Sequence, residues 1–247
     1  MIRDAHAVRT GIGPRPLAGG RVPRPVIEVI ERDDGLINGA PADHYLGHPD
    51  EWQPHDRQAL RLCRGQVLDV GCGAGRTAIE LQTRGMAVTG LDTSPGAIEV
   101  ARARGLRDTI VTTVDAYAEK ATTRYDTFLL LGNNLGLLES RERAPVLLAA
   151  LARLARPGAR IIGQGTDPYG TTDPVHVGYH RRNRELGRIG GQLRLRLRYR
   201  LLATEWFDYL FCSVDELRSL LDGTGWRLKS VDEQDRPYYL AVMELSP

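Results

Sequence analysis

The chain has few cysteines, few lysines and no long apolar run. Its three cysteines, Cys63, Cys72 and Cys212, form no C-x-x-C pair. This argues against a disulfide framework and a structural zinc site, and it favours a reducing, cytoplasmic location. No stretch approaches the roughly 18 apolar residues that span a bilayer. The first residues are basic but lack the apolar segment of a signal peptide, so we expect no membrane association.

An excess of charge of one sign is also missing. The formal net charge is +2 at pH 7, with 33 Lys and Arg residues against 31 Asp and Glu residues. A nearly neutral chain has no general attraction for a polyanion, so composition disfavours a nucleic-acid partner. Nothing in the sequence indicates the oligomeric state.

The organisation along the chain predicts one α/β domain behind a short arm. Residues 1–24 are rich in proline, glycine and arginine, which predicts a mobile N-terminal arm. Residues 25–247 form the expected domain, and its cap segment, residues 25–60, should begin with a helix over 25–35. From residue 66, apolar strands alternate with helices. This alternation predicts a doubly wound, Rossmann-like fold with a seven-stranded, mostly parallel sheet.

The regular alternation breaks at an insert, residues 167–212, which follows the fifth strand. Its first part is polar and rich in Gly and Pro, which disfavours a helix there. Residues 192–202 then alternate between apolar side chains and arginine, and residues 204–212 are apolar and aromatic. We therefore expect an antiparallel β-hairpin on the substrate side of the domain.

The strongest chemical signal is the run VLDVGCGAGR at residues 67–76. A buried strand leads into Gly71, Gly73 and Gly75 and then directly into a helix, which predicts a nucleotide-binding loop. The spacing is G-x-G-x-G, and Arg76 stands where a dinucleotide-binding loop has its third glycine. Asp69 just before the loop would repel a pyrophosphate and attract a cation. The loop therefore favours a cationic ligand without phosphate.

Two further carboxylates follow the next two strands. Asp92 closes the second strand, where a carboxylate can accept both hydroxyls of a ribose. Asp115 is expected at the end of the third strand, where it can accept an adenine amino group. A ligand with an adenosine group and a cationic tail would give each of the three carboxylates a partner. S-adenosylmethionine is such a ligand, because it has an ammonium and a sulfonium and no phosphate.

With these motifs, the chain resembles the class I S-adenosylmethionine-dependent methyltransferases. VLDVGCGAGR looks like their first motif, VTGLDTSPGAIEVAR their second, and TTVDAY their adenine motif. YDTFLLLGNNLGLL resembles their fourth-strand motif, but it lacks the Asn/Asp-Pro-Pro-aromatic signature of enzymes that methylate base amino groups. The resemblance covers roughly residues 60–165 and 205–247.

The resemblance implies a set of cofactor-binding residues and S-adenosylhomocysteine as the product. Glycines of the loop would line the methionine part, and Cys72 would be a small buried filler within it. The Gly132 backbone would take the ammonium, and Tyr45 could close over the cofactor. The expected cofactor-binding residues are Tyr45, Asp69, Gly71, Cys72, Gly73, Gly75, Asp92, Thr93, Asp115, Ala116, Gly132 and Asn133.

No catalytic side chain stands out. In-line displacement at a sulfonium methyl depends mainly on holding the acceptor in place, so little acid–base chemistry is required. Tyr179 and His180 are weak candidates for a base. The pairs His44/His48 and His176/His180 lack acidic partners at ligand spacing, so we expect no metal.

The leading hypothesis is methyl transfer to a small-molecule acceptor. Eight arginines in residues 181–200 leave open an RNA or protein methyltransferase, although their alternation also suits the solvated face of a strand. A third hypothesis is a non-catalytic binder of S-adenosylmethionine or S-adenosylhomocysteine.

Overall fold

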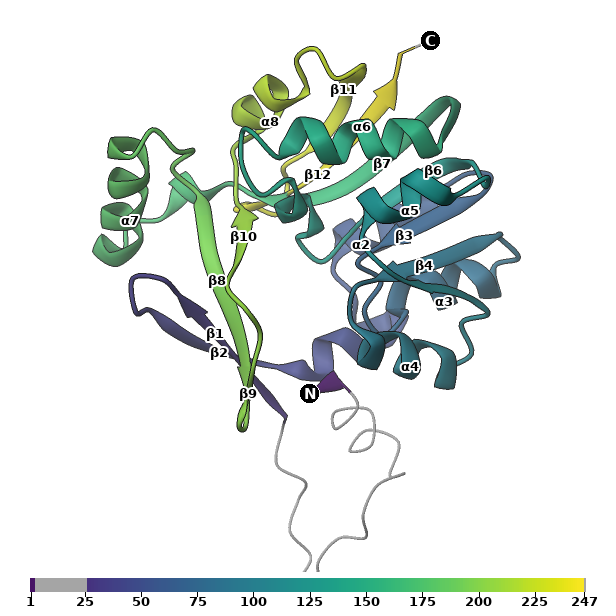
Figure 1. Ribbon diagram of the computed structural model, residues 1–247, viewed down its shortest axis with the longest axis horizontal. Helices are drawn as coiled ribbons and strands as arrows, with labels where there is room; N and C mark the ends of the chain where they lie inside the picture. Colours follow the sequence, from purple (N-terminus) through teal and green to yellow (C-terminus); the bar gives the residue numbers. More distant parts are fainter. Residues whose placement is uncertain (3–25, 247) are drawn as a thin grey trace, which may run out of the picture.

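The computed structural model describes residues 1–2 and 26–246. The predicted mobile arm, residues 1–24, lies outside the described residues except for its first two. The described part contains two sheets that face each other across a cleft (Figure 1).

The main sheet has seven strands in the order β11-β12-β7-β6-β3-β4-β5. Its strands are β3 (Val67–Val70), β4 (Val88–Asp92), β5 (Asp108–Val111), β6 (Tyr125–Leu130), β7 (Ala155–Thr166), β11 (Trp226–Asp232) and β12 (Tyr238–Leu245). Strands β3 to β7 run parallel to one another, and β12 pairs antiparallel with both of its neighbours, β7 and β11. This confirms the predicted doubly wound, mostly parallel seven-stranded sheet.

Helices cover both faces of the main sheet, as its apolar strands require. They are α2 (Pro54–Leu62), α3 (Arg76–Thr83), α4 (Pro95–Ala103), α5 (Val114–Lys120), α6 (Ala144–Leu154) and α8 (Val214–Leu221). Apolar side chains of α2, α3 and α4 pack in one core cluster, and those of α5, α6 and α8 pack in the other. Predicted start signals hold: Ser94 caps α4, and Ser213 with Glu216 forms a capping box on α8.

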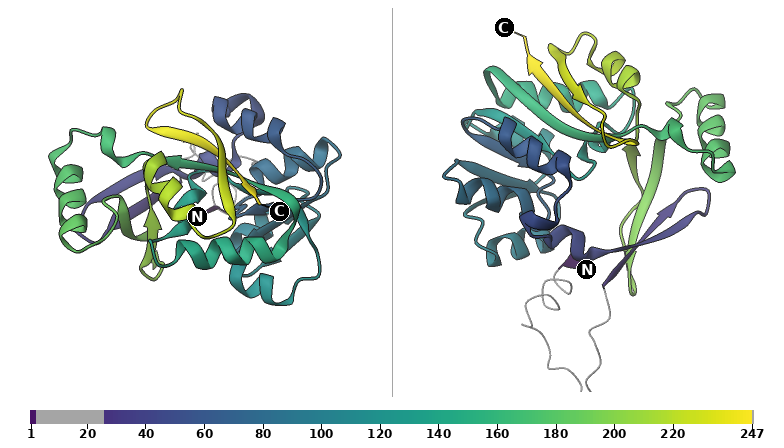
Figure 2. Two further views of the ribbon diagram at one scale, coloured as in Figure 1. Left: turned by 90° about the horizontal axis from the view of Figure 1, so that it is seen from above. Right: turned by 180° about the vertical axis from the view of Figure 1, so that it is seen from behind.

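The second sheet is antiparallel and has the order β10-β8-β1-β2, with β9 paired to β8. Its strands are β1 (Ile27–Arg32), β2 (Ile37–Pro41), β8 (Gln192–Tyr199), β9 (Leu202–Ala203) and β10 (Phe207–Leu210). The cap segment and the insert, far apart in sequence, therefore share one sheet. It stands beside the main sheet, with α7 (Pro174–Glu185) next to one end of it (Figures 1 and 2).

Short 3-10 helices complete the described chain. They are η1 (Ala42–Leu46), η2 (Pro49–Glu51), η3 (Asn134–Leu138) and η4 (Pro168–Gly170). Within the described residues, no helix combines the length and the apolar character needed to cross a membrane.

Two local predictions are wrong. A helix was predicted over residues 25–35, but the described part of this range, residues 26–35, contains β1 and a turn through Gly35, because pairing with β2 and β8 overrides the helical spacing of the apolar residues. The polar part of the insert contains α7, which was not expected. Asp173 caps that helix by accepting a hydrogen bond from the Val175 N–H, and Pro174 occupies its first turn, where proline fits.

Candidate functional site

A cleft of about 2950 Å³ lies between the carboxyl ends of β3, β4 and β6 and the second sheet. Ligand pockets commonly measure about 300–1,000 Å³. The cleft therefore has room for a nucleoside-sized cofactor together with a second molecule.

The glycine loop forms one wall of this cleft. Gly71 and Gly73 have positive φ angles, +70° and +55°, which side chains with a Cβ atom rarely adopt. The Asn134 side-chain amide donates to the carbonyl oxygens of Val70 and Gly71, at 2.9 and 3.1 Å. A Cβ atom on Gly71 would lie 2.5 Å from that amide nitrogen, so the loop geometry depends on Asn134. Asn134 was not among the expected site residues.

Cys72 and Gly75 have packing roles in the same loop. Cys72 is buried, and its thiol lies against Gly90 of β4, which agrees with a small filler. Gly75 does not line the cleft: a Cβ atom there would lie 3.2 to 3.3 Å from side chains of Ile79, Ala101 and Leu106. The close approach that this glycine permits is to side chains of α3, α4 and the loop after α4, and its expected contact with the cofactor stays a prediction.

Asp92 lies beside the loop at the end of β4. Its carboxylate accepts hydrogen bonds from the Gly73 and Ser94 N–H groups, each at 2.8 Å. A carboxylate has about four lone-pair sites, so two remain for a ligand. Asp92 is half-buried, Thr93 is exposed, and both line the cleft.

Asp115 reaches the cleft from α5 and not from a strand end. The strand β5 already stops at Val111, and Thr113 caps α5 by accepting from the Ala116 N–H. Asp115 Oδ2 accepts from Arg143, while Oδ1 is buried with no hydrogen-bond partner among the described residues. Such an atom suits an amino donor of a ligand. Ala116 is not among the residues that line the cleft, and its expected contact with the cofactor stays a prediction.

Asp69 is buried beneath the loop and accepts a 2.7 Å hydrogen bond from the Thr77 hydroxyl. Burial raises the pKa of its carboxyl to about 6, although the Thr77 hydrogen bond and the Arg76 charge act in the opposite direction. The nearby Asp92 charge adds to the rise. A cationic ligand over the loop would favour the ionised form of Asp69.

The raised pKa gives a prediction for stability. Because the folded protein holds the Asp69 proton more tightly than the unfolded chain, this carboxyl should lower stability as pH rises from about 4 through about 6. Asp69→Asn removes the titration and keeps an oxygen for Thr77. The stability of the variant relative to the unsubstituted protein should therefore increase by about 1–3 kcal/mol across this range. Urea unfolding at pH 4.5 and pH 7 measures it, and a constant difference would contradict the prediction.

The loop after β6 closes the floor of the cleft. Gly132 and Asn133 both have positive φ angles, and their N–H groups donate to the side-chain oxygen of Gln164. The Asn133 side-chain oxygen accepts from Thr166, and its carbonyl oxygen accepts a 2.6 Å hydrogen bond from the Tyr209 hydroxyl. Both Gly132 and Asn133 line the cleft, and Tyr209 ties β10 to this loop.

Tyr45 lies over the glycine loop from η1. A Cβ atom on Gly73 would be 3.9 Å from its ring. The Tyr45 hydroxyl donates to Glu28 of β1 at 3.0 Å, and both residues line the cleft. Glu28 is a site residue that the sequence did not indicate, because the predicted helix gave no reason to turn it inward.

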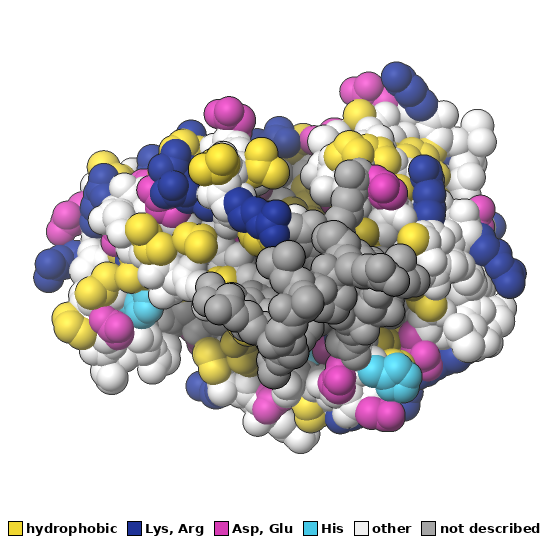
Figure 3. All heavy atoms as spheres, turned by 90° about the horizontal axis from the view of Figure 1, so that it is seen from below, with side chains coloured by type: hydrophobic (Ala, Val, Ile, Leu, Met, Phe, Trp, Pro, Cys, Tyr) yellow, Lys and Arg dark blue, Asp and Glu magenta, His cyan; other side chains and the backbone are white. Residues whose placement is uncertain are grey.

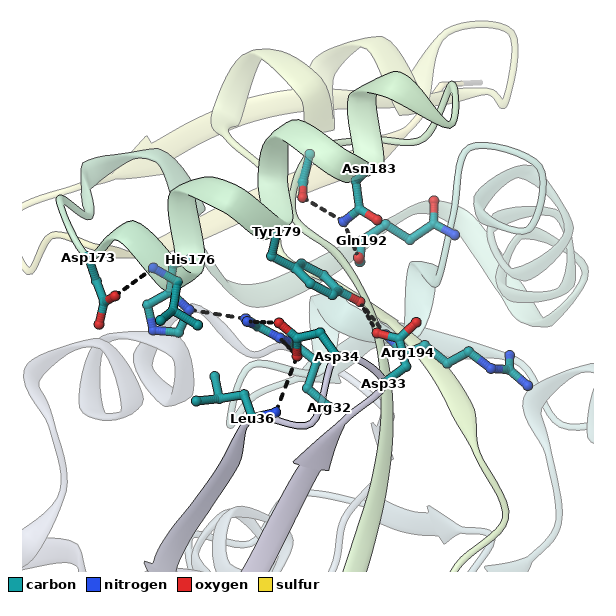
Figure 4. Close-up of polar contacts among 12 residues, drawn as sticks. Arg32, Asp33, Asp34, Leu36, Asp173, His176, Tyr179, Asn183, Gln192 and Arg194 are labelled. Carbon is teal, nitrogen blue, oxygen red and sulfur yellow. Dashed lines mark hydrogen bonds and ion pairs between the residues drawn. The ribbon is translucent and has the colours of Figure 1, made fainter.

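The two candidates for a base lie on α7, and Tyr179 points toward the turn between β1 and β2 (Figure 4). The Tyr179 hydroxyl donates to Asp33 at 2.6 Å, and the Arg32 guanidinium stacks on its ring. Burial raises the Tyr179 pKa, and the residue is not among those that line the cleft, so the geometry gives its candidacy as a base no support. It joins α7 to the hairpin instead.

His180 and His176 are four residues apart on α7. His180 is buried, lines the cleft, and stacks edge-on against Tyr169. Burial, with nearby Arg184, lowers its pKa, so it is neutral near pH 7. Arg32 donates to His176 Nδ1 at 3.0 Å, which uses that nitrogen as an acceptor (Figure 4).

The sequence and the fold are similar to those of known methyltransferases. The sequence profile of a methyltransferase domain matches residues 67–158. A ubiquinone biosynthesis O-methyltransferase of Alkalilimnicola ehrlichii is 34% identical over 123 residues, which are 44% of this chain and 48% of that protein. One from Saccharophagus degradans is 32% identical over 45% of this chain and 52% of its own length. The chain thus spans about half the length of the curated relatives it matches.

A solved structure extends the likeness to nearly the whole fold. It is a SAM-dependent methyltransferase from Bacteroides fragilis in complex with S-adenosyl-L-homocysteine, with a TM-score of 0.78 at 23% identity over 91% of this chain and 90% of that one. The main sheet, the glycine loop and its acids define a Rossmann-like nucleoside-binding domain. Residues 67–158 thus match a methyltransferase domain, and the described chain shares the overall fold of that solved methyltransferase.

Proposed function

We propose that the chain is an enzyme that transfers the methyl group of S-adenosylmethionine to a small-molecule acceptor bound in the cleft. One observation carries this proposal. The glycine loop, Asp92 and Asp115 line the same cleft as the inner face of the second sheet. A cofactor held by the first wall would therefore present its reactive end to a molecule held by the second.

The residues present fit the cofactor. The unpartnered Asp115 Oδ1 suits the adenine amino group, and Asp92 keeps acceptor capacity for the ribose hydroxyls. Asp69 places negative charge under the loop where the cationic part would lie. When bound, S-adenosylmethionine supplies an electrophilic methyl group, and the protein supplies the orientation of the acceptor.

A small acceptor is favoured by the relatives and by the second sheet. The relatives' names place their acceptors in ubiquinone biosynthesis, which is small-molecule chemistry. The profile match stops at residue 158, before β8 and β10. We therefore expect acceptor recognition in this chain to depend on its own second sheet.

The arginines of the insert do not favour a nucleic-acid acceptor. Arg196 and Arg198 of β8 pair with Glu31 of β1, and Arg194 pairs with Asp208. On the face in Figure 3, Lys and Arg side chains are interspersed with acidic and apolar ones. An RNA site needs a basic surface that is free to neutralise phosphates.

Titration calorimetry and product analysis test the function. We expect S-adenosylmethionine and S-adenosylhomocysteine to bind with micromolar Kd values, and reduced nicotinamide dinucleotide not to bind. Mass spectrometry should then detect S-adenosylhomocysteine formation with a panel of small amines, alcohols and phenols, but not with bulk transfer RNA. Cofactor binding without turnover of any panel member would favour the non-catalytic binder. Turnover only with RNA, abolished by added salt, would overturn the small-molecule proposal.

A further inference from the structure

The Glu28 carboxylate is deeply buried on the inner face of the second sheet. The residue is 2% exposed and lines the cleft. Its Oε2 accepts the hydrogen bond from Tyr45, whereas Oε1 is buried with no hydrogen-bond partner among the described residues. Burying a carboxylate oxygen without a donor is costly, so such an atom in a cleft calls for a donor from a ligand.

The surroundings of Glu28 are mostly apolar. Glu28 of β1 pairs with Ala40 of β2. Ile30, two residues further along β1, pairs with Leu197 of β8. Ile30, Leu195 and Leu197 line the same cleft. The charged and titratable groups that act on Glu28 are Tyr45, His44 and the amino group of Met1. The inner face therefore offers apolar side chains beside a buried carboxylate oxygen that lacks a donor in the described part of the chain, with Arg32 and Asn38 as further polar residues of the cleft.

We propose that Glu28 is the catalytic carboxylate for the acceptor and that this acceptor is a small amine with an apolar body, whose nitrogen donates to Glu28 Oε1. The proposal rests on the proposed function and specifies its acceptor. An ammonium supplies both a hydrogen-bond donor and the opposite charge, and a bond between charged partners is stronger than one to a neutral hydroxyl. The leucines and isoleucine of the inner face would bury the rest of the molecule.

The amine must lose a proton before it can react. Glu28 accepts that proton from the ammonium, and the freed lone pair of the nitrogen forms the bond to the methyl carbon. The carbon–sulfur bond breaks with its electron pair on sulfur, which leaves a neutral thioether and a methylated ammonium. Glu28 then releases the proton to solvent. Burial raises the Glu28 pKa above its ordinary value, in spite of the Tyr45 hydrogen bond and the positive charges nearby, which makes it a better base.

Tyr45 connects this carboxylate to the cofactor wall. Its ring lies against Gly73 while its hydroxyl holds Glu28 Oε2. The Tyr45 side chain therefore connects the glycine loop, where the methyl group is expected, to the carboxylate that would hold the amine. Tyr45 is thus a positioning residue for Glu28.

The test uses three matched probes: phenethylamine, phenethyl alcohol and 3-phenylpropionate. Each is titrated into the full chain saturated with S-adenosylhomocysteine, and its methylation by S-adenosylmethionine is followed by mass spectrometry. We expect binding and turnover of the amine only. Glu28→Gln keeps an oxygen for the Tyr45 hydroxyl and removes the charge, so amine binding should weaken by about 100-fold while the Kd of S-adenosylhomocysteine stays unchanged.

The control is Glu31→Gln, on the opposite face of β1, where Glu31 pairs with Arg196 and Arg198. It should leave amine binding within about twofold of the unsubstituted protein. The proposal is overturned by equal acceptance of the alcohol, by binding of none of the probes, or by a Glu28→Gln variant that loses cofactor affinity instead of amine affinity. Failure of the proposed function is separate, because it appears as absence of S-adenosylmethionine binding before any probe is added.

Discussion

Replacing Asp92 by alanine should weaken S-adenosylmethionine binding by about 100-fold or more. The carboxylate holds the Gly73 and Ser94 N–H groups and has capacity for two ligand hydroxyls. Hydrogen bonds to a charged group each contribute about 1.5–3 kcal/mol, so losing two of them amounts to at least about 3 kcal/mol. Titration calorimetry with the unsubstituted protein and the variant measures the change.

A matched control separates binding from folding. Asp108 is an exposed carboxylate at the opposite end of the neighbouring strand β5, so Asp108→Ala should leave the cofactor Kd unchanged. Both variants should unfold within a few degrees of the parent protein, since neither removes core side chains. Comparable tight binding by the parent and by Asp92→Ala would show that the ribose assignment is wrong.

Most of the residues that the sequence predicts for the cofactor wall line the cleft, because the signals for this wall are local. Asp69 lies within β3, Gly71 directly follows it, and Asp92 ends β4, and parallel pairing of β3 with β4 necessarily brings their carboxyl ends together. Two of the residues predicted for this wall are not among those that line the cleft. Ala116 turns away because Thr113 already starts a helix, and Gly75 serves packing against the neighbouring helix.

The other wall of the cleft, formed by the second sheet, was less predictable because its strands come from distant parts of the sequence. Glu28 is separated from Tyr45 by 17 residues, and Tyr209 from Asn133 by 76. Along β1 the buried face carries Glu28 and Arg32, so neither an alternating nor a helical apolar pattern marks it. The hairpin of the insert was recognisable from its alternation, but its pairing with β1 was not.

The contact between α2 of the cap segment and α3, the helix that follows the glycine loop, should contribute strongly to stability. Arg76 forms a two-pronged ion pair with Asp56 of α2, at 2.9 and 3.0 Å, and its guanidinium lies 4.9 Å from the centre of a Trp52 ring. The side chains of Arg76 and Asp56 are 17% and 7% exposed. Arg76→Ala would leave Asp56 buried without its partner, so we expect a loss of about 3–5 kcal/mol in the free energy of unfolding.

Arg84 provides the comparison, since it pairs with Glu80 at the other end of the same helix but with 43% and 24% of the two side chains exposed. Arg84→Ala should cost less than about 0.5 kcal/mol. In a double-mutant cycle, Asp56→Ala combined with Arg76→Ala should cost clearly less than the sum of the single variants, because the double variant leaves no unpaired buried charge. Equal losses from Arg76→Ala and Arg84→Ala in urea unfolding would contradict this view. A large loss confined to the buried pair would show that Arg76, in place of the third glycine of a dinucleotide-binding loop, fastens the cap segment to the cofactor wall.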